Sequence, residues 1–142
     1  MPMIDIFATI GTFKDPHRLA IDAATVVKTV EQVPDIPMFR KHTAAFVHEL
    51  KPGYVSNVDG DGNYVRVQVL TNAGALDRAK QTAVVRRLTD LVATAAGDEG
   101  LKERTWVLLT EAVAGGWGLW GYAHTNEEIV AAAKDQLTKR RG

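Results

Sequence analysis

The chain has 142 residues, and 46% of them are hydrophobic, which is enough for one domain with an apolar core. Its 17 basic and 17 acidic residues balance, so no overall field would attract nucleic acid or an anionic membrane. The absence of cysteine excludes disulfides, thiolate nucleophiles and cysteine-ligated zinc. No apolar run is long enough to span a bilayer and no signal peptide is visible, so we expect a soluble cytoplasmic protein.

The first predicted element is an apolar strand that begins at Pro2 and ends at Ala8. Methionine is usually removed before a residue as small as proline, and the new N-terminus would be a secondary amine on a rigid strand. Burial among apolar side chains lowers the pKa of such an amine, which suits a general base near neutral pH. Pro2 is therefore a candidate catalytic residue. The simpler alternative is a proline that follows methionine without any chemical role.

A helix is expected next, with Asp15 as its N-cap and Pro16 at the first helical position. Apolar residues at helical spacing between Leu19 and Val30 predict one buried side, and the helix should stop before Pro34. A second strand is predicted near Thr43–Leu50.

The second half repeats this order. Residues 64–70 alternate as a strand does, Gly74 ends it, and a helix follows with its apolar side between Leu76 and Ala95. Gly97 is a natural helix end, and Trp106–Thr110 is the fourth predicted strand. A capping box formed by Thr125 and Glu128 begins a C-terminal helix.

The two halves match at an offset of roughly 60 residues, in the range of a duplicated supersecondary unit. We therefore predict a single α+β domain over residues 1–142, with β-α-β units at about 2–58 and 63–122 and a helix at 125–140. Each unit has parallel strands and a right-handed crossover. The four strands form one mixed sheet with two helices on one face. The other face also carries apolar residues, and a second subunit is its expected cover.

The sequence resembles the tautomerase superfamily, which contains 4-oxalocrotonate tautomerase, malonate semialdehyde decarboxylase, the 3-chloroacrylate dehalogenases and macrophage migration inhibitory factor. The resemblance rests on the Pro2 strand closed by Gly11 and on the second unit, which includes Val67–Leu70, Lys80 and Trp106–Glu111. The segment Gly116–Gly121 resembles the family's glycine-rich hairpin. This resemblance implies a homotrimer of fused units, with Pro2 as acid or base at the floor of a pocket near a subunit interface.

The resemblance and the residue types also suggest which side chains would bind a substrate. Trp117 falls at the place of an aromatic pocket wall, although it could equally serve a core or an interface. We expect Trp106 to line the pocket with it. Asn72 and His42 are candidate donors to a developing enolate oxygen. Thr12 stands where relatives place a carboxylate-binding arginine.

Several residues depart from the family pattern. Arginine positions of relatives hold Thr12, Ala75, Ala44 and Trp106, and Leu119 replaces a hairpin glutamate that activates water in one dehalogenase. Dehalogenation and hydration are therefore disfavoured. An acidic substrate would need other donors, and the remaining candidates are Arg40, Lys41, His42, Arg66 and Asn72.

No metal or cofactor is predicted. The four histidines have no compact ligand spacing, and the acidic loop at residues 59–63 matches only the start of a calcium-binding pattern. No nucleophile elbow, phosphate loop or dinucleotide fingerprint is present.

Our first hypothesis is a cofactor-independent tautomerase that acts on an α-keto acid or a related carbonyl compound. A second is decarboxylation or other enolate or iminium chemistry at the same amine. A third, of another class, is a trimeric binding module with little activity, which the missing arginines favour.

Overall fold

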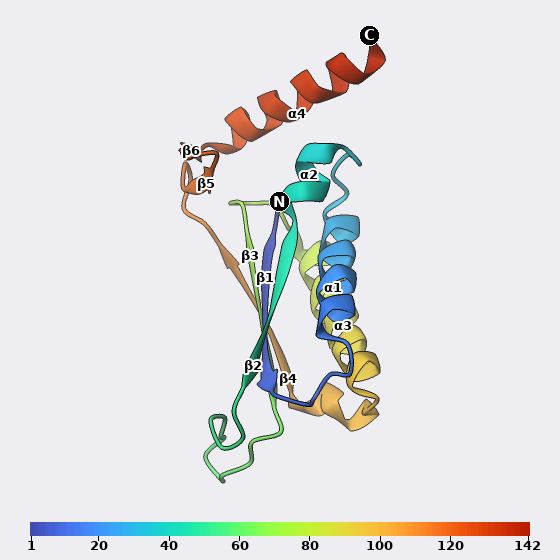
Figure 1. Ribbon diagram of the computed structural model, residues 1–142. Helices are drawn as coiled ribbons and strands as arrows, with labels where there is room; N and C mark the ends of the chain where they lie inside the picture. The colour runs from blue at the N-terminus through green and yellow to red at the C-terminus, as the bar shows by residue number, and fades with distance from the viewer.

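The computed structural model describes residues 1–142, and its centre is a four-stranded sheet with the order β2-β1-β3-β4. The strands are β1 (Met3–Thr9), β2 (Ala44–Leu50), β3 (Val65–Thr71) and β4 (Thr105–Glu111). β1 is parallel to β2, β3 is parallel to β4, and the inner strands β1 and β3 are antiparallel. This arrangement confirms the predicted mixed sheet (Figure 1).

Two long helices, α1 (Pro16–Glu31) and α3 (Arg78–Ala96), cover one face of the sheet (Figure 1). The Asp15 carboxylate accepts a hydrogen bond from the Arg18 N–H at 3.0 Å, which is the predicted cap of α1. At the end of α3, Gly97 has a φ of 64°, the left-handed conformation in which helices commonly end. Local signals in the sequence therefore define both helices.

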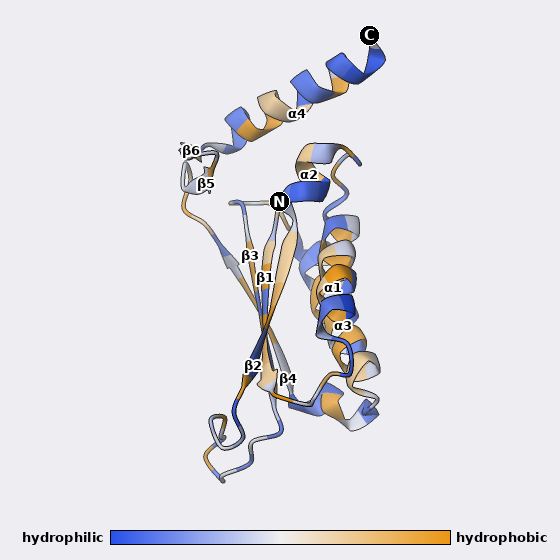
Figure 2. Ribbon diagram, viewed as in Figure 1, coloured by the Kyte–Doolittle hydropathy of each residue, from blue (hydrophilic) through white to orange (hydrophobic).

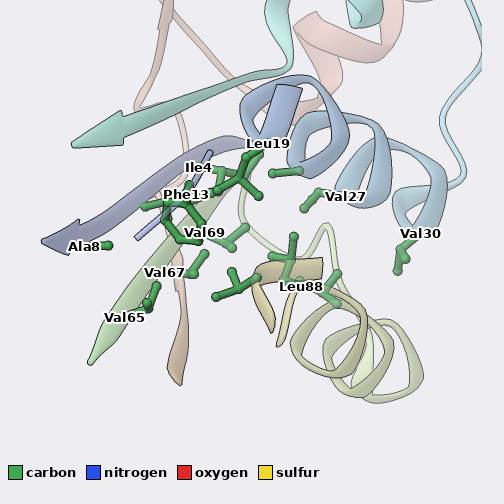
Figure 3. Close-up of a cluster of buried hydrophobic side chains, with 14 of the residues drawn as sticks. Ile4, Ala8, Phe13, Leu19, Val27, Val30, Val65, Val67, Val69 and Leu88 are labelled. Atoms are coloured by element: carbon green, nitrogen blue, oxygen red, sulfur yellow. The ribbon is translucent and has the colours of Figure 1, made fainter. Parts of the chain in front are cut away.

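The main core lies between this face of the sheet and the two helices (Figure 3). Its inward-facing strand residues alternate along β1 and β3, as expected for strands with one buried face. The fully buried side chains of these strands and helices include Ile4, Ile6, Val65, Val67, Val69, Ala23, Val27 and Val84. On α3 the structure buries Val84, Leu88 and Val92. Ala79, one of the residues that the helical spacing between Leu76 and Ala95 places on the apolar side, is exposed. The apolar side of α3 therefore centres on Val84, Leu88 and Val92, which belong to the main core.

The core can be tested at Ile6, which is 0% exposed. Ile6→Ala should lower the free energy of unfolding by about 2–5 kcal/mol, because it removes buried methyl groups and leaves a cavity. Urea denaturation followed by circular dichroism measures this loss. The matched control is Ile10→Ala, since Ile10 is 58% exposed and its loss should stay within about 0.5 kcal/mol. Equal losses in the two variants would contradict this core.

Two short helical elements are not predicted by the sequence patterns: α2 (Pro37–His42) and the 3-10 helix η1 (Glu99–Arg104). The chain leaves α1 at Glu31, passes Pro34 and begins α2 at Pro37, which fits the first turn of a helix because it needs no N–H partner there. α2 brings its last residues to the start of β2.

The last part of the chain forms a hairpin and a helix. The hairpin strands are β5 (Trp117–Leu119) and β6 (Tyr122–His124), and α4 spans Asn126–Arg141. The Thr125 hydroxyl accepts a hydrogen bond from the Glu128 N–H, as predicted, but the Glu128 carboxylate accepts one from the Tyr122 hydroxyl. Only half of the capping box is therefore formed. None of the helices combines the length and the apolar character that crossing a membrane requires.

The face of the sheet away from the helices carries exposed apolar side chains. Phe46 on β2 is 48% exposed, Trp106 and Leu108 on β4 are 49% and 42% exposed. Phe46 and Leu108 lie in one row across the sheet, joined through Asp5 and Gln68. The strands that carry these residues, β2 and β4, are the two edges of the sheet. Their outer backbone groups therefore have no strand partner within the chain. We call this surface the open face. Figure 2 shows apolar residues along the strands as well as along the two covering helices.

Candidate active site

The first two residues are buried at the end of the sheet near α2, the hairpin and α4 (Figure 1). Met1 is 2% exposed and belongs to a second group of buried side chains, here called the terminal cluster. The other members come from three distant parts of the chain: Ile36, Met38, Phe39, Trp117, Ile129 and Ala133. α2, β5 and α4 thus close over the start of β1, and Pro2 lies buried between Met1 and that strand.

The Met1 ammonium pairs with a buried carboxylate. Its nitrogen lies 3.2 Å from Glu31 Oε1, and the Glu31 side chain is 7% exposed. Burial lowers the pKa of the Met1 amine below its ordinary value, and the charge and hydrogen bond of Glu31 oppose part of that effect. Glu31 Oε2 is buried without a hydrogen-bond partner. This end of the sheet therefore places an amine of reduced basicity beside one carboxylate.

A cleft of about 380 Å³ adjoins the terminal cluster. Its floor is one row of strand residues, because Met3 is in register with both Ala44 and Leu70. α2 and the hairpin segment supply the walls: Lys41, His42, Ala112, Gly116, Trp117, Gly118 and Leu119. Trp117 belongs both to the cleft and to the terminal cluster, so the Met1 side chain and the cleft share a wall. Loss of Met1 would open the cluster beside the cleft.

The hairpin turn at this end has an unusual residue. Trp120 and Gly121 have φ values of 55° and 74°, the left-handed pair of a two-residue hairpin turn, in which Asn-Gly is the favoured sequence. A tryptophan in this conformation costs on the order of 1–3 kcal/mol. Its ring makes edge contacts with His42 and His124, at centroid distances of 5.4 and 5.8 Å. Trp120 therefore contacts a residue that lines the cleft.

The structure brings some of the predicted site residues together. Trp117 and His42 line the cleft, and Pro2 lies directly before its floor residue Met3. Asn72 does not line it, although Asn72 Nδ2 is buried without a partner. Three of the sequence candidates are thus close to the start of β1.

Trp106 and Thr12 are not brought to this cleft within one chain. Thr110 is in register with Leu70, and Trp106 lies four residues earlier, about 13 Å away along the strand. Thr12 follows the far end of β1, where its hydroxyl donates to the Thr9 carbonyl at 2.7 Å. Both residues belong to the opposite end of the sheet because β1 and β4 each run the full length between the two ends.

The candidate donors for an acidic substrate are also divided. Lys41 lines the cleft next to His42, whereas Arg40 lines a separate groove between α1 and α2. Arg66 lies on the open face with its guanidinium 5.5 Å from the centre of the Phe7 ring. Leu119, at the place of the relatives' hairpin glutamate, lines the cleft. The cleft therefore contains one lysine and one histidine as possible cations, and no arginine.

Sequence reasoning missed Glu31. A signal was present, because Glu31 continues the buried side of α1 at a spacing of four from Val27, Ala23 and Leu19. An acidic residue in the last helical turn also opposes the helix dipole. Both its position on the buried side and its position at the C-terminal end of the helix are unfavourable for a carboxylate. Such a residue indicates a nearby partner that compensates for this cost.

No family model and no curated protein matches this sequence. Solved structures do match. N1, a member of the cis-3-chloroacrylic acid dehalogenase family, has a TM-score of 0.71 and 15% identity, covering 97% of this chain and 96% of its own. The fused 4-OT protein Q0, a symmetric trimer, has a TM-score of 0.72 and 15% identity over 89% of this chain and 98% of its own.

A macrophage migration inhibitory factor-like protein from Entamoeba histolytica is similar too, with a TM-score of 0.67 and 18% identity over 87% of this chain and 98% of its own. At such identities the comparison establishes the architecture. The chain has the tautomerase fold over nearly its whole length.

Proposed function

We propose that this protein is a cofactor-independent tautomerase of the tautomerase superfamily, and that the Pro2 amine is its general base and acid. The observation that carries the proposal is the position of Pro2, buried at the start of β1 beside an apolar cleft in a tautomerase fold. Removal of Met1 turns the Pro2 nitrogen from an amide into a secondary amine. It also vacates the space that Met1 fills in the terminal cluster.

The proposed reaction moves one proton within an enol of an α-keto acid or a related carbonyl compound. The neutral amine accepts the enol O–H proton, and the resulting ammonium donates a proton to the neighbouring carbon, so that the keto form is released and the amine is restored. Burial favours the neutral amine at the start of this cycle. A positioned base contributes about 10²–10⁴-fold, so the site must also stabilise the enolate.

The walls of the cleft suggest roles in that stabilisation. We assign His42 as a donor to the enolate oxygen and Lys41 as the partner of a substrate carboxylate, since both line the cleft. Trp117 and the space left by Met1 would hold an aryl or other apolar group. Asn72 stays a candidate donor if its unpartnered amide turns toward the vacated space.

We further propose a homotrimer, in which the open faces and the edge strands of three copies cover one another. The exposed Phe46, Trp106 and Leu108 support this assembly, as does the symmetric trimer formed by fused 4-OT. In such an assembly Trp106 and Thr12 could approach the cleft of a neighbouring copy, which one chain alone does not allow.

Two other functions use the same groups. Decarboxylation or iminium formation would also depend on the Pro2 amine, and borohydride treatment with a candidate aldehyde would trap an iminium as a mass increase on Pro2. A binding module with little activity is favoured by one observation, the absence of arginine from the cleft.

The test is ketonisation of phenylenolpyruvate, followed by ultraviolet absorbance, with mature protein and the Pro2→Ala variant. Activity that falls in the variant would support the amine as catalyst. Equal rates in the two proteins, or no activity despite a free Pro2 verified by intact mass, would refute the tautomerase proposal.

A further inference from the structure

Glu31 is a buried acid that the proposed proton transfer has not used. Its side chain is 7% exposed at the last position of α1, and only the Met1 ammonium contacts its carboxylate, through Oε1. A buried carboxylate without a cationic or hydrogen-bonded partner is strongly unfavourable. In this structure the terminal amine of Met1 is that partner.

Removal of Met1 transfers that role to the next nitrogen in the chain. Three covalent bonds separate the Met1 nitrogen from the Pro2 nitrogen, so the new amine is generated within the same buried region. Glu31 then loses its only ionic partner, while Oε2 is already unpartnered. The two nitrogen positions are separated by only three bonds, a distance that rotation about the side-chain bonds of Glu31 can cover.

We propose that Glu31 is the ionic partner of the Pro2 amine in the protein that has lost Met1, and that it holds the ammonium form between the two proton transfers. This inference rests on the proposed function of Pro2. Glu31 acts through Pro2 and is a positioning residue. The proton taken from the substrate stays on the Pro2 nitrogen, the N–H donates to the Glu31 carboxylate, and the same nitrogen then releases a proton to the substrate carbon.

Few other charged groups compete for Glu31. From α3, Lys80 donates to the Glu31 backbone carbonyl at 3.1 Å rather than to its carboxylate. From α2, Lys41 and His42 face the cleft. The remaining contacts around Met1 are the apolar members of the terminal cluster, from α2, β5 and α4. Besides the Met1 amine, Lys80 is the cation whose contact with Glu31 the structure records.

The pairing has a consequence for substrate orientation. A carboxylate of the substrate that approached the amine from the vacated space would meet Glu31, and like charges there repel in a medium of low dielectric. The anionic end of a keto acid should instead lie toward Lys41 and His42, with its apolar end in the vacated space. The site thus selects substrates in which the end that contacts the terminal cluster is uncharged.

The experiment is a titration that needs no substrate. Mature protein with ¹⁵N-labelled proline is followed by the nitrogen shift of Pro2 against pH, in the wild type, Glu31→Gln and Glu31→Asp. The matched control is Glu103→Gln, because Glu103 is exposed on η1 and lies outside the site. The pH dependence of kcat/KM for phenylenolpyruvate is recorded for the same proteins.

Glu31→Gln should move the midpoint of the Pro2 titration to lower pH, since it removes the carboxylate that stabilises the ammonium. Glu31→Asp should keep the charge and lie between Glu31→Gln and the wild type, and Glu103→Gln should coincide with the wild type. An unchanged midpoint in Glu31→Gln, as expected if Lys80 takes over the carboxylate, would overturn the inference. A shifted midpoint in a protein without ketonisation activity would leave the pairing standing and refute the proposed function instead.

Discussion

Protein that retains Met1 should ketonise phenylenolpyruvate about 10²–10⁴-fold more slowly than protein that begins at Pro2, the range that a positioned base contributes. With Met1 in place, the Pro2 nitrogen is an amide without a basic lone pair. The Met1 amine cannot replace it, because it lies in the terminal cluster and pairs with Glu31 at 3.2 Å. The Met1 side chain also fills the space that we assign to the substrate.

The two forms can be prepared from one gene by expression with and without inhibition of methionine aminopeptidase. Intact mass identifies each form by the presence or absence of one methionine residue. Thermal unfolding of both forms serves as the control, since the retained form keeps its cluster packed and should be folded. Equal kcat/KM values in the two forms would show that Pro2 is not the base.

A double substitution of the open face, Phe46→Lys with Leu108→Lys, should dissociate the proposed trimer. These residues are 48% and 42% exposed on the two edge strands. In the trimer each lysine would place an ammonium without a partner in an apolar interface. Burial of such a charge is unfavourable for assembly, and this unfavourable free energy recurs in each of the three copies. Sedimentation velocity should show the mass falling from three times 15.5 kDa to the mass of one chain.

The control for this experiment is Val58→Lys, the same apolar-to-basic change at a side chain that is already fully exposed in the loop between the two units. It should leave the mass unchanged. Both proteins should keep their far-ultraviolet circular dichroism, because the core lies on the other face of the sheet. A double variant that sediments like the wild type would contradict the open face as the interface.

The sheet and its two covering helices were predictable because their signals are local. Asp15 and Pro16 mark the start of α1, Gly97 marks the end of α3, and the alternation of Val65, Val67 and Val69 marks a strand with one buried face. A mixed sheet follows from two β-α-β units in sequence. The resemblance to the tautomerase superfamily supplied the hairpin, which no local pattern predicted alone.

The contents of the cleft were less predictable, because they depend on register and on packing between distant segments. Trp117 and His42 line one cleft because the hairpin and α2 meet at the start of β1. Trp106 looks equivalent as a residue type, but the pairing of Leu70 with Thr110 leaves it near the other end of the sheet. Sequence reasoning missed Glu31 because its partner is the amine at the chain terminus, and the residue pattern of a helix gives no information about that partner.

The antiparallel pairing of β1 with β3 also relates the two ends of the sheet by an approximate half-turn. The floor of the cleft, Met3 with its neighbours, has its counterpart in a hollow of about 310 Å³ that Phe7, Arg66 and Trp106 help to line. There, however, β3 follows Tyr64 through a peptide bond, so the nitrogen at that place is an amide. Duplication of the unit thus supplies two related hollows per chain but only one position for the proposed proline amine. Three chains in the proposed trimer would carry three such amines among six hollows.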